Sequence, residues 1–177
     1  MNKLLLTSAL AVSLGALATM PAAQAATPNT GTINITGKVV QDTCSINVNG
    51  SGNAVLLPTV TTDTLNAAAG TTAGPQNFTL NLTGCDSTAT AAQLNFTTGS
   101  NNLADGNLKN NGTAKNVEVQ LLAGTNLINV GSNLNAPSVT LTSGAGSTPM
   151  TARYYAVTTG VTAGTVSTSA SVTFSYQ

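Results

Sequence analysis

The chain contains no histidine and no tryptophan, and only 6% of its 177 residues are charged. Without histidine it lacks the usual general base of enzymes and cannot form a Ser-His-Asp triad. No pair of carboxylates stands out as an acid and a base, and no motif around Lys38 would make it the base for a nearby serine. The sequence therefore predicts a protein that is not an enzyme.

The N-terminus has the features of an export signal. Lys3 supplies a positive charge, residues 4–18 form an apolar stretch, and Ala23-Gln-Ala25 matches the small-x-small cleavage pattern. The apolar stretch is shorter than the roughly 20 residues that span a bilayer, which argues against the alternative of a retained membrane anchor. We expect residues 1–25 to be a signal peptide that is removed, leaving residues 26–177 as an exported chain.

Residues 26–177 carry few charges of either sign, against an average share of about 25% charged residues in globular proteins. The basic residues are scattered and form no stripe, so nucleic-acid binding is not expected. A surface with so little charge repels copies of itself only weakly, which favours association. The charged residues are Lys38, Lys109, Lys115 and Arg153 against Asp42, Asp63, Asp86, Asp105 and Glu118, a net charge of −1.

Cys44 and Cys85 are the only cysteines. In an exported chain an even number of cysteines most simply forms disulfides, and the alternative here is two free thiols. Closing a loop of about 42 residues would stabilise the fold by about 4 kcal/mol in the chain-entropy model. The chain has no CxxC motif, and two cysteines without histidine make a poor metal site, so neither redox chemistry nor a metal or cofactor is expected. Asp42 and Asp86 lie near the cysteines, and we interpret them as solvated loop residues.

Most of the chain alternates apolar and polar side chains with the period of two that is typical of half-buried strands. Gly, Asn, Pro and Ser interrupt the pattern at turns. We expect loops at residues 61–75, 101–116 and 124–137, with a short helical turn near residues 64–69. About seven strands predict an all-β, two-sheet immunoglobulin-like sandwich. Strands are expected at residues 31–39, 78–83, 94–96, 117–121, 139–141, 153–158 and 172–176.

The segment 31–39 has the most regular alternation. One face carries Gly31, Ile33, Ile35, Gly37 and Val39, and the other carries Thr32, Asn34, Thr36 and Lys38. From the pattern alone, this strand either completes the sheet of its own domain or enters the core of another molecule.

Several motifs, in their order and spacing, resemble the pilins of the bacterial chaperone–usher class, with the major subunit family of type 1 fimbriae as the nearest pattern. The resemblance covers nearly the whole chain. It rests on the signal peptide and on Gly31-Thr-Ile-Asn-Ile-Thr-Gly-Lys-Val-Val40, Leu82-Thr-Gly-Cys-Asp86, Val117-Glu-Val-Gln-Leu-Leu122, Ala152-Arg-Tyr-Tyr-Ala156, Val161-Thr-Ala-Gly164 and Phe174-Ser-Tyr-Gln177.

The resemblance implies an incomplete immunoglobulin-like sandwich, residues 41–177, that lacks its last strand. Residues 26–40 would be an N-terminal donor extension that fills the open groove of another subunit, with Gly31, Ile33, Ile35, Gly37 and Val39 as the donor face. Cys44 and Cys85 match the disulfide of the family. Val172, Phe174, Tyr176 and Gln177 match the C-terminal segment that the periplasmic chaperone recognises.

The implied function is a structural subunit of a surface fimbria that polymerises head to tail and supports adhesion and biofilm formation. Its expected partners are other pilin subunits, a periplasmic chaperone and an outer-membrane usher, and the assembled fibre could meet a host receptor. The alternative is a minor adaptor or a single-domain adhesin that binds a host glycan or protein. The sequence does not separate shaft subunit from adaptor.

Overall fold

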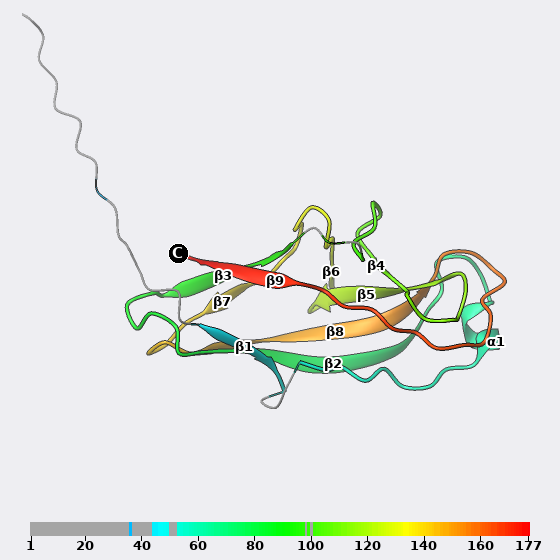
Figure 1. Cartoon of the computed structure of the whole chain (residues 1–177), viewed down its shortest axis with the longest axis horizontal. Coiled ribbons are helices and arrows are strands. Elements are labelled where there is room, and N and C mark those ends of the chain that lie inside the picture. The colour runs from blue at the N-terminus through cyan, green and yellow to red at the C-terminus, as the bar shows by residue number, and fades with distance from the viewer. Residues whose placement is uncertain (1–35, 37–43, 50–52, 98, 100) are drawn as a thin grey trace, which may run out of the picture. The chain divides into compact units, whose positions relative to one another are not determined.

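The computed structural model describes residue 36 and residues 44–49, 53–97, 99 and 101–177. Contacts divide the chain into two units, Met1–Lys38 and Val39–Gln177, and every described residue except Thr36 lies in the second. The described part of this second unit consists of antiparallel strands and one short helix (Figure 1). This confirms the predicted all-β class. The predicted signal peptide lies outside the described residues.

Two antiparallel sheets form this unit. The larger has the strand order β1-β2-β8-β5-β4, with β6 also paired to β5, and the smaller has the order β7-β3-β9. In the larger sheet the strands are β1 (Ser45–Val48), β2 (Thr72–Thr83), β4 (Leu108–Lys109), β5 (Val117–Ala123), β6 (Asn126–Ile128) and β8 (Gly146–Ala156). In the smaller sheet they are β3 (Ala91–Phe96), β7 (Ser138–Thr140) and β9 (Val172–Tyr176).

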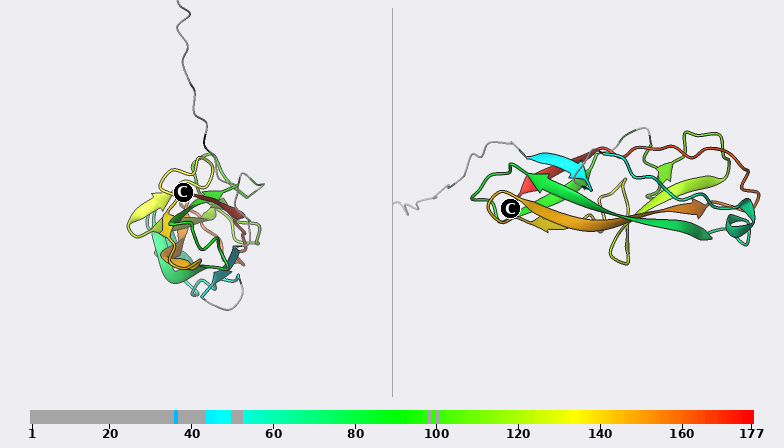
Figure 2. Two further views of the ribbon diagram at one scale, coloured as in Figure 1. Left: turned by 90° about the vertical axis from the view of Figure 1, so that its left-hand side faces the viewer. Right: turned by 90° about the horizontal axis from the view of Figure 1, so that it is seen from below.

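Helix α1 (Thr62–Leu65) lies at the end of this unit opposite the C-terminus (Figures 1 and 2). At that end Asn66 holds the loop after β8, because its side-chain amide exchanges two hydrogen bonds with the backbone of Val161. Among the described residues no helix is long and apolar enough to cross a bilayer.

The hydrophobic core lies between the two sheets. Alternate side chains of β2, β5 and β8 meet those of β3 and β7, because one face of each strand points inward. The largest fully buried side chains of this cluster are Leu82, Leu94, Ile128, Met150, Val130 and Val139. A second, smaller cluster around Leu65, Val117 and Val161 packs near α1.

The predicted strands at 78–83, 94–96, 117–121, 139–141 and 172–176 are found as β2, β3, β5, β7 and β9, with shifted or longer bounds for the first four. The strand predicted at 153–158 is found as the second half of β8, which begins earlier and ends at Ala156. Three loop predictions were wrong in part: β4 lies within the loop expected at 101–116, β6 lies within the loop expected at 124–137, and β2 begins within the loop expected at 61–75. Strand β1 was not predicted. The helical turn expected near 64–69 is α1, two residues earlier.

The start of β2 was misread because a bulge lies in it. The register with β8 shifts between Ala73 and Gln76, so the strand continues through a Gly-Pro pair that ordinarily ends one. Gly74 has a φ of 57°, and a Cβ there would lie 3.0 Å from Val60 and 3.1 Å from Tyr154. Both the turn and the close packing therefore require glycine at this position.

The first half of β8 was missed because it carries little apolar alternation. Gly146 and Thr148 lie on the same face of β8 as the buried Met150 and Ala152. Neither is a large apolar residue. Pro149 lies opposite Thr79 of β2, and the pairing of β8 with β5 reaches only to Thr151. A proline is tolerated there because that part of β8 has a described partner on one side only.

Candidate functional site: an open apolar groove

A groove of about 570 Å³ opens between the sheets and is lined mainly by apolar side chains. One rim is formed by β1 and residues 53–57, and the other by residues 166–172, which lead into β9. The floor belongs to the larger sheet and includes Phe78, Leu80, Val119, Leu121, Met150 and Ala152. Two stretches far apart in sequence therefore face each other across exposed core.

The rim that leads into β9 shows a regular alternation over residues 165–177. Every even-numbered residue is half-buried and every odd-numbered residue is exposed. Val166, Ala170, Val172, Phe174 and Tyr176 pack against the core from these even positions. The segment thus behaves as one long strand with an apolar face turned inward, although only Val172–Tyr176 is paired as a strand.

The inward face of this segment is less covered than that of its neighbour β3. Ala92 and Leu94 of β3 have no exposed surface and Phe96 is 3% exposed, whereas none of the inward side chains at the even positions 166–176 is fully buried. Both strands border the same core, so the side chains on the side of β9 are less covered than those of β3.

The backbone of the same segment is hydrogen-bonded along one of its two edges. The odd-numbered residues bond toward the interior of the unit: Thr97 donates to the carbonyl of Ser171, Asn111 to that of Ser167, and Gln177 to that of Ala91. Backbone groups of successive strand residues point to opposite sides. The N–H and C=O groups of the even-numbered residues therefore point to the groove side, where no described strand pairs with β9.

The opposite rim was not anticipated from the sequence. Ile46 and Val48 of β1 and Val55 and Leu57 beyond it are half-buried against the core, while Leu56 between the last two is 89% exposed. The alternation there covers only a few residues, and such a short pattern gives a weak signal.

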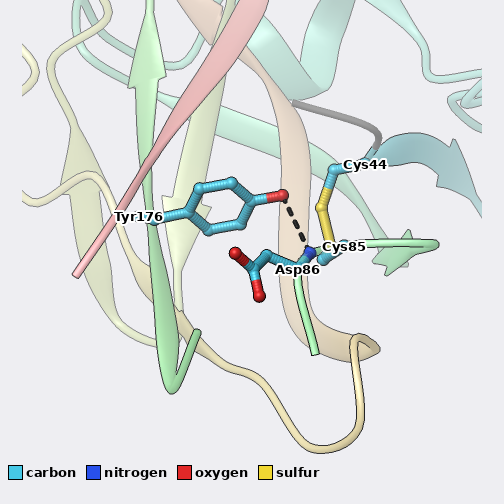
Figure 3. Close-up of a disulfide and its surroundings, with 4 residues drawn as sticks. All are labelled: Cys44, Cys85, Asp86 and Tyr176. Carbon is cyan, nitrogen blue, oxygen red and sulfur yellow. Dashed lines mark hydrogen bonds between the residues drawn. A yellow bond between two sulfur atoms is a disulfide. The ribbon is translucent and has the colours of Figure 1, made fainter. Parts of the chain in front are cut away.

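The disulfide expected from the sequence joins Cys44 and Cys85. Cys44 directly precedes β1 and Cys85 follows β2, so the bridge fastens one rim of the groove to the larger sheet. Beside it, the backbone N–H of Asp86 donates to the hydroxyl of Tyr176 over 3.2 Å (Figure 3). Residues of the C-terminal strand and the disulfide thus lie at the same end of the unit.

The structure places the predicted C-terminal recognition residues together on β9. Val172, Phe174 and Tyr176 share the half-buried inward face, and the rings of Phe174 and Tyr176 meet edge to face with centroids 5.6 Å apart. Exposed Gln177 continues the pairing by donating its backbone N–H to the carbonyl of Ala91. The donor-face residues Gly31, Ile33, Ile35, Gly37 and Val39 lie outside the described residues, as does Asp42.

Two side chains with hydroxyl groups, Thr168 and Tyr154, also line this apolar groove. The Thr168 hydroxyl oxygen is buried without a hydrogen-bond partner among the described residues, which is a costly state for a polar atom. Tyr154 also lines the groove, and burial raises the pKa of its phenol. Among the described residues no group of three or more His, Cys, Asp or Glu side chains could hold a metal ion.

A small polar cluster lies where β4 meets β5. The buried Asn107 side chain donates to a carboxylate oxygen of Asp105 at 3.0 Å and to one of Glu118 at 2.9 Å. Burial raises the pKa of Glu118, the hydrogen bond from Asn107 opposes that rise, and the neighbouring Asp105 adds to it. The cluster fixes the loop before β4, whose Leu108 reaches the groove.

Comparison with known proteins identifies the family to which this chain belongs. The family model described as "Fimbrial protein" matches residues 33–177. The chain is 36% identical to an F17 fimbrial protein of Escherichia coli, covering 83% of this chain and 87% of that one. It is 38% identical to the major fimbrial subunit SMF-1 of Stenotrophomonas maltophilia (82% and 92%), and 33% identical to a type-1 fimbrial protein A chain of Escherichia coli (94% and 94%).

Solved structures show the same fold. The P pilus rod subunit PapA matches with a TM-score of 0.59 at 24% identity, covering 82% of this chain and all of that one. A chain from the structure of a chaperone–usher pilus matches with a TM-score of 0.60 at 23% identity, covering 85% and 97%. The resemblance inferred from the motifs is confirmed: the chain belongs to the fimbrial protein family, is a structural protein rather than an enzyme, and is located in surface fimbriae.

Proposed function

We propose that this chain is a repeating shaft subunit of a chaperone–usher pilus that polymerises by donor-strand exchange. The domain 41–177 is an immunoglobulin-like sandwich that lacks one strand. The extension 26–40 of one subunit supplies that strand by entering the groove of the next. The signal peptide, residues 1–25, is removed during export.

The observation that carries this proposal is the strand-like segment 165–177, with its half-buried apolar face and its open backbone edge beside a groove of about 570 Å³. An exposed edge of this kind is a template for strand addition. An added strand would cover the inward side chains and pair with the free backbone groups at the same time.

Segment 31–39 has the composition that such a groove requires. Burying Ile33, Ile35 and Val39 would contribute roughly 5–9 kcal/mol, at about 1.5–3 kcal/mol for each side chain. Each backbone hydrogen bond adds about 0.5–1.5 kcal/mol. Transfer of the strand from copy to copy joins two different surfaces and does not close on itself, so it generates an open filament.

Before polymerisation the same groove must be protected, and a periplasmic chaperone is the partner that we assign to it. It would pair with the open edge of β9 and engage Val172, Phe174, Tyr176 and Gln177. An outer-membrane usher would then exchange the chaperone for the next subunit. Adhesion and biofilm formation would follow from the fibre, whose relatives are named as fimbrial subunits.

The test is electrophoresis in SDS of material sheared from producing cells, run with and without boiling. The wild type should give a ladder of subunit multiples that collapses on boiling. Ile35→Lys should abolish the ladder because it places a charge on the donor face, whereas Asn34→Lys, on the opposite face, should keep it. A wild type that runs as a monomer under both conditions would refute the proposal.

A further inference from the structure

The C-terminal segment that borders the groove is held in two different ways along its length. From Val172 onward its backbone pairs with β3 in a regular ladder. Residues 165–171, the rim segment, show the same alternation of half-buried and exposed side chains, but no described strand pairs with them (Figure 1). The hydrogen bonds that keep the rim segment extended therefore come from another source.

The carbonyl groups of the rim segment are bonded at every second residue. Those of residues 165, 167, 169 and 171 each accept at least one hydrogen bond. Three of the donors are backbone N–H groups, those of Ala114, Asn111 and Thr97. At Ser169 the donor is the side-chain amide of Asn101, which lies 3.2 Å from the carbonyl oxygen and 2.8 Å from the hydroxyl. Asn101 thus takes the place of a strand residue opposite Ser169.

Asn110 serves an N–H group of the rim segment in the same way. Its Oδ1 accepts from the backbone N–H of Ser167 at 2.9 Å and from that of Gly112 at 2.8 Å. Its Nδ2 donates to the carbonyl of Ala114 at 2.9 Å. The opposite orientation of this amide would place its NH₂ group against two N–H groups, so the network fixes the orientation.

The Asn101 amide is also oriented by its neighbours. Its Oδ1 accepts from the Asn111 side chain at 2.7 Å, which turns its NH₂ group toward Ser169. The backbone carbonyl of Asn101 accepts from the N–H of Lys109 in β4. Truncating the Asn101 side chain therefore removes the contact with Ser169 and leaves the loop backbone bonded to β4.

The rim segment has few other interactions that favour an extended backbone. It reads Thr-Val-Ser-Thr-Ser-Ala-Ser, and its only apolar side chains, Val166 and Ala170, bury little area. Serine and threonine hydroxyls compete for nearby backbone groups and favour turns. The hydrogen bond from Asn101 occupies the Ser169 hydroxyl in the middle of the segment and so removes one such competitor.

We propose that Asn101 and Asn110 are positioning residues for strand acceptance, which rests on the function proposed above. Their side chains hold the rim segment in the extended conformation in which the N–H and C=O groups of the even-numbered residues face the groove. A segment that leaves this conformation offers an added strand fewer backbone partners. Both asparagines bond to the odd-numbered residues, at the opposite edge, so they act without contact with the added strand.

The first test measures how fast the joints between subunits dissociate in SDS at a fixed temperature. In fibres made only of Asn101→Ala, every joint has an altered rim segment. Dissociation should be about 2- to 10-fold faster than in the wild type, as expected for the loss of one ordinary hydrogen bond. Asn110→Ala should change the rate in the same direction.

The matched control is Asn95→Ala. The Asn95 amide also bonds to a serine of the C-terminal segment, the Ser175 hydroxyl at 3.4 Å. Ser175 lies in β9, where the backbone ladder with β3 already holds the strand. Fibres of Asn95→Ala should therefore dissociate at the wild-type rate.

A second experiment separates an effect on the rim segment from an effect on the whole subunit. The Ile35→Lys subunit should accept a strand but not donate one. Producing it in excess together with Asn101→Ala should give dimers in which Asn101→Ala is the donor and the accepting rim segment is wild type. These dimers should dissociate at the rate of a wild-type joint.

Two results would overturn the positioning role and leave strand exchange standing: Asn101→Ala fibres that dissociate at the wild-type rate, or dimers that dissociate as fast as those fibres. Loss of both fibres and dimers would place the role of Asn101 in folding and would also overturn the proposal. Absence of a ladder in the wild type would instead overturn the proposed function.

Discussion

Filling the groove at Ala170 should block strand exchange without unfolding the subunit. Ala170 is half-buried on the inward face of the rim, which the proposed donor strand would cover. Ala170→Leu would displace an apolar side chain of the donor, losing about 1.5–3 kcal/mol of burial. Forcing both side chains into the groove would instead cost about 1–3 kcal/mol of strain.

Either effect weakens the joint by about 1–3 kcal/mol, which corresponds to a loss of affinity between about 5-fold and about 140-fold. The assay is the temperature at which sheared fibres dissociate in SDS, together with the amount of ladder formed. Ala170→Leu should lower both, while the thermal midpoint of the subunit, followed by circular dichroism, should change little because the side chain enters open space.

The matched control is Ser171→Leu, the next residue along the rim, whose side chain is exposed on the opposite face. It should leave the ladder and its dissociation temperature unchanged. A fibre of Ala170→Leu as heat-resistant as the wild type, or equal damage by Ser171→Leu, would refute the reasoning that the even face of this segment contacts the donor.

Three further predictions concern the subunit itself. Replacing Cys44 and Cys85 by alanine should lower the free energy of unfolding by about 4 kcal/mol in urea titrations, because the bridge spans 41 residues. The reduced wild type should lose about the same free energy of unfolding. A change below about 1 kcal/mol would contradict the loop-closure argument. Because the pKa of folded Glu118 lies above its ordinary 4.5, its contribution to stability is present below pH 4.5 and is lost as the pH rises through the raised pKa. Glu118→Gln should therefore raise the thermal midpoint at pH 7 but not near pH 4; equal midpoint shifts at both pH values would count against this cause. Thr168→Val should raise the free energy of unfolding by about 1 kcal/mol or more by removing the unpartnered hydroxyl, and a decrease would mean that the hydroxyl has a partner.

The β class, the strands with apolar alternation and the cysteine pair could be predicted from local patterns in the chain. Alternation is local, so β5 and β9 could be read directly from Val117–Leu121 and Val172–Tyr176. The cysteine pairing followed from their number and the export signal. Strands without that local signal were missed: β4 has two residues, β6 has three, and the start of β8 carries Gly146 and Thr148 where an apolar pattern would need larger side chains.

The position of the open groove depends on how the strands pack in three dimensions. The rim at 53–57 faces the rim at 166–172 because the chain folds β1 and β9 to opposite sides of one core, and no local pattern encodes that separation. The half-burial of Val172, Phe174 and Tyr176 is likewise set by how far the rest of the unit covers them. The alternation of a strand predicts which of its faces is apolar. Whether that face is covered depends on how the strand packs against the rest of the protein.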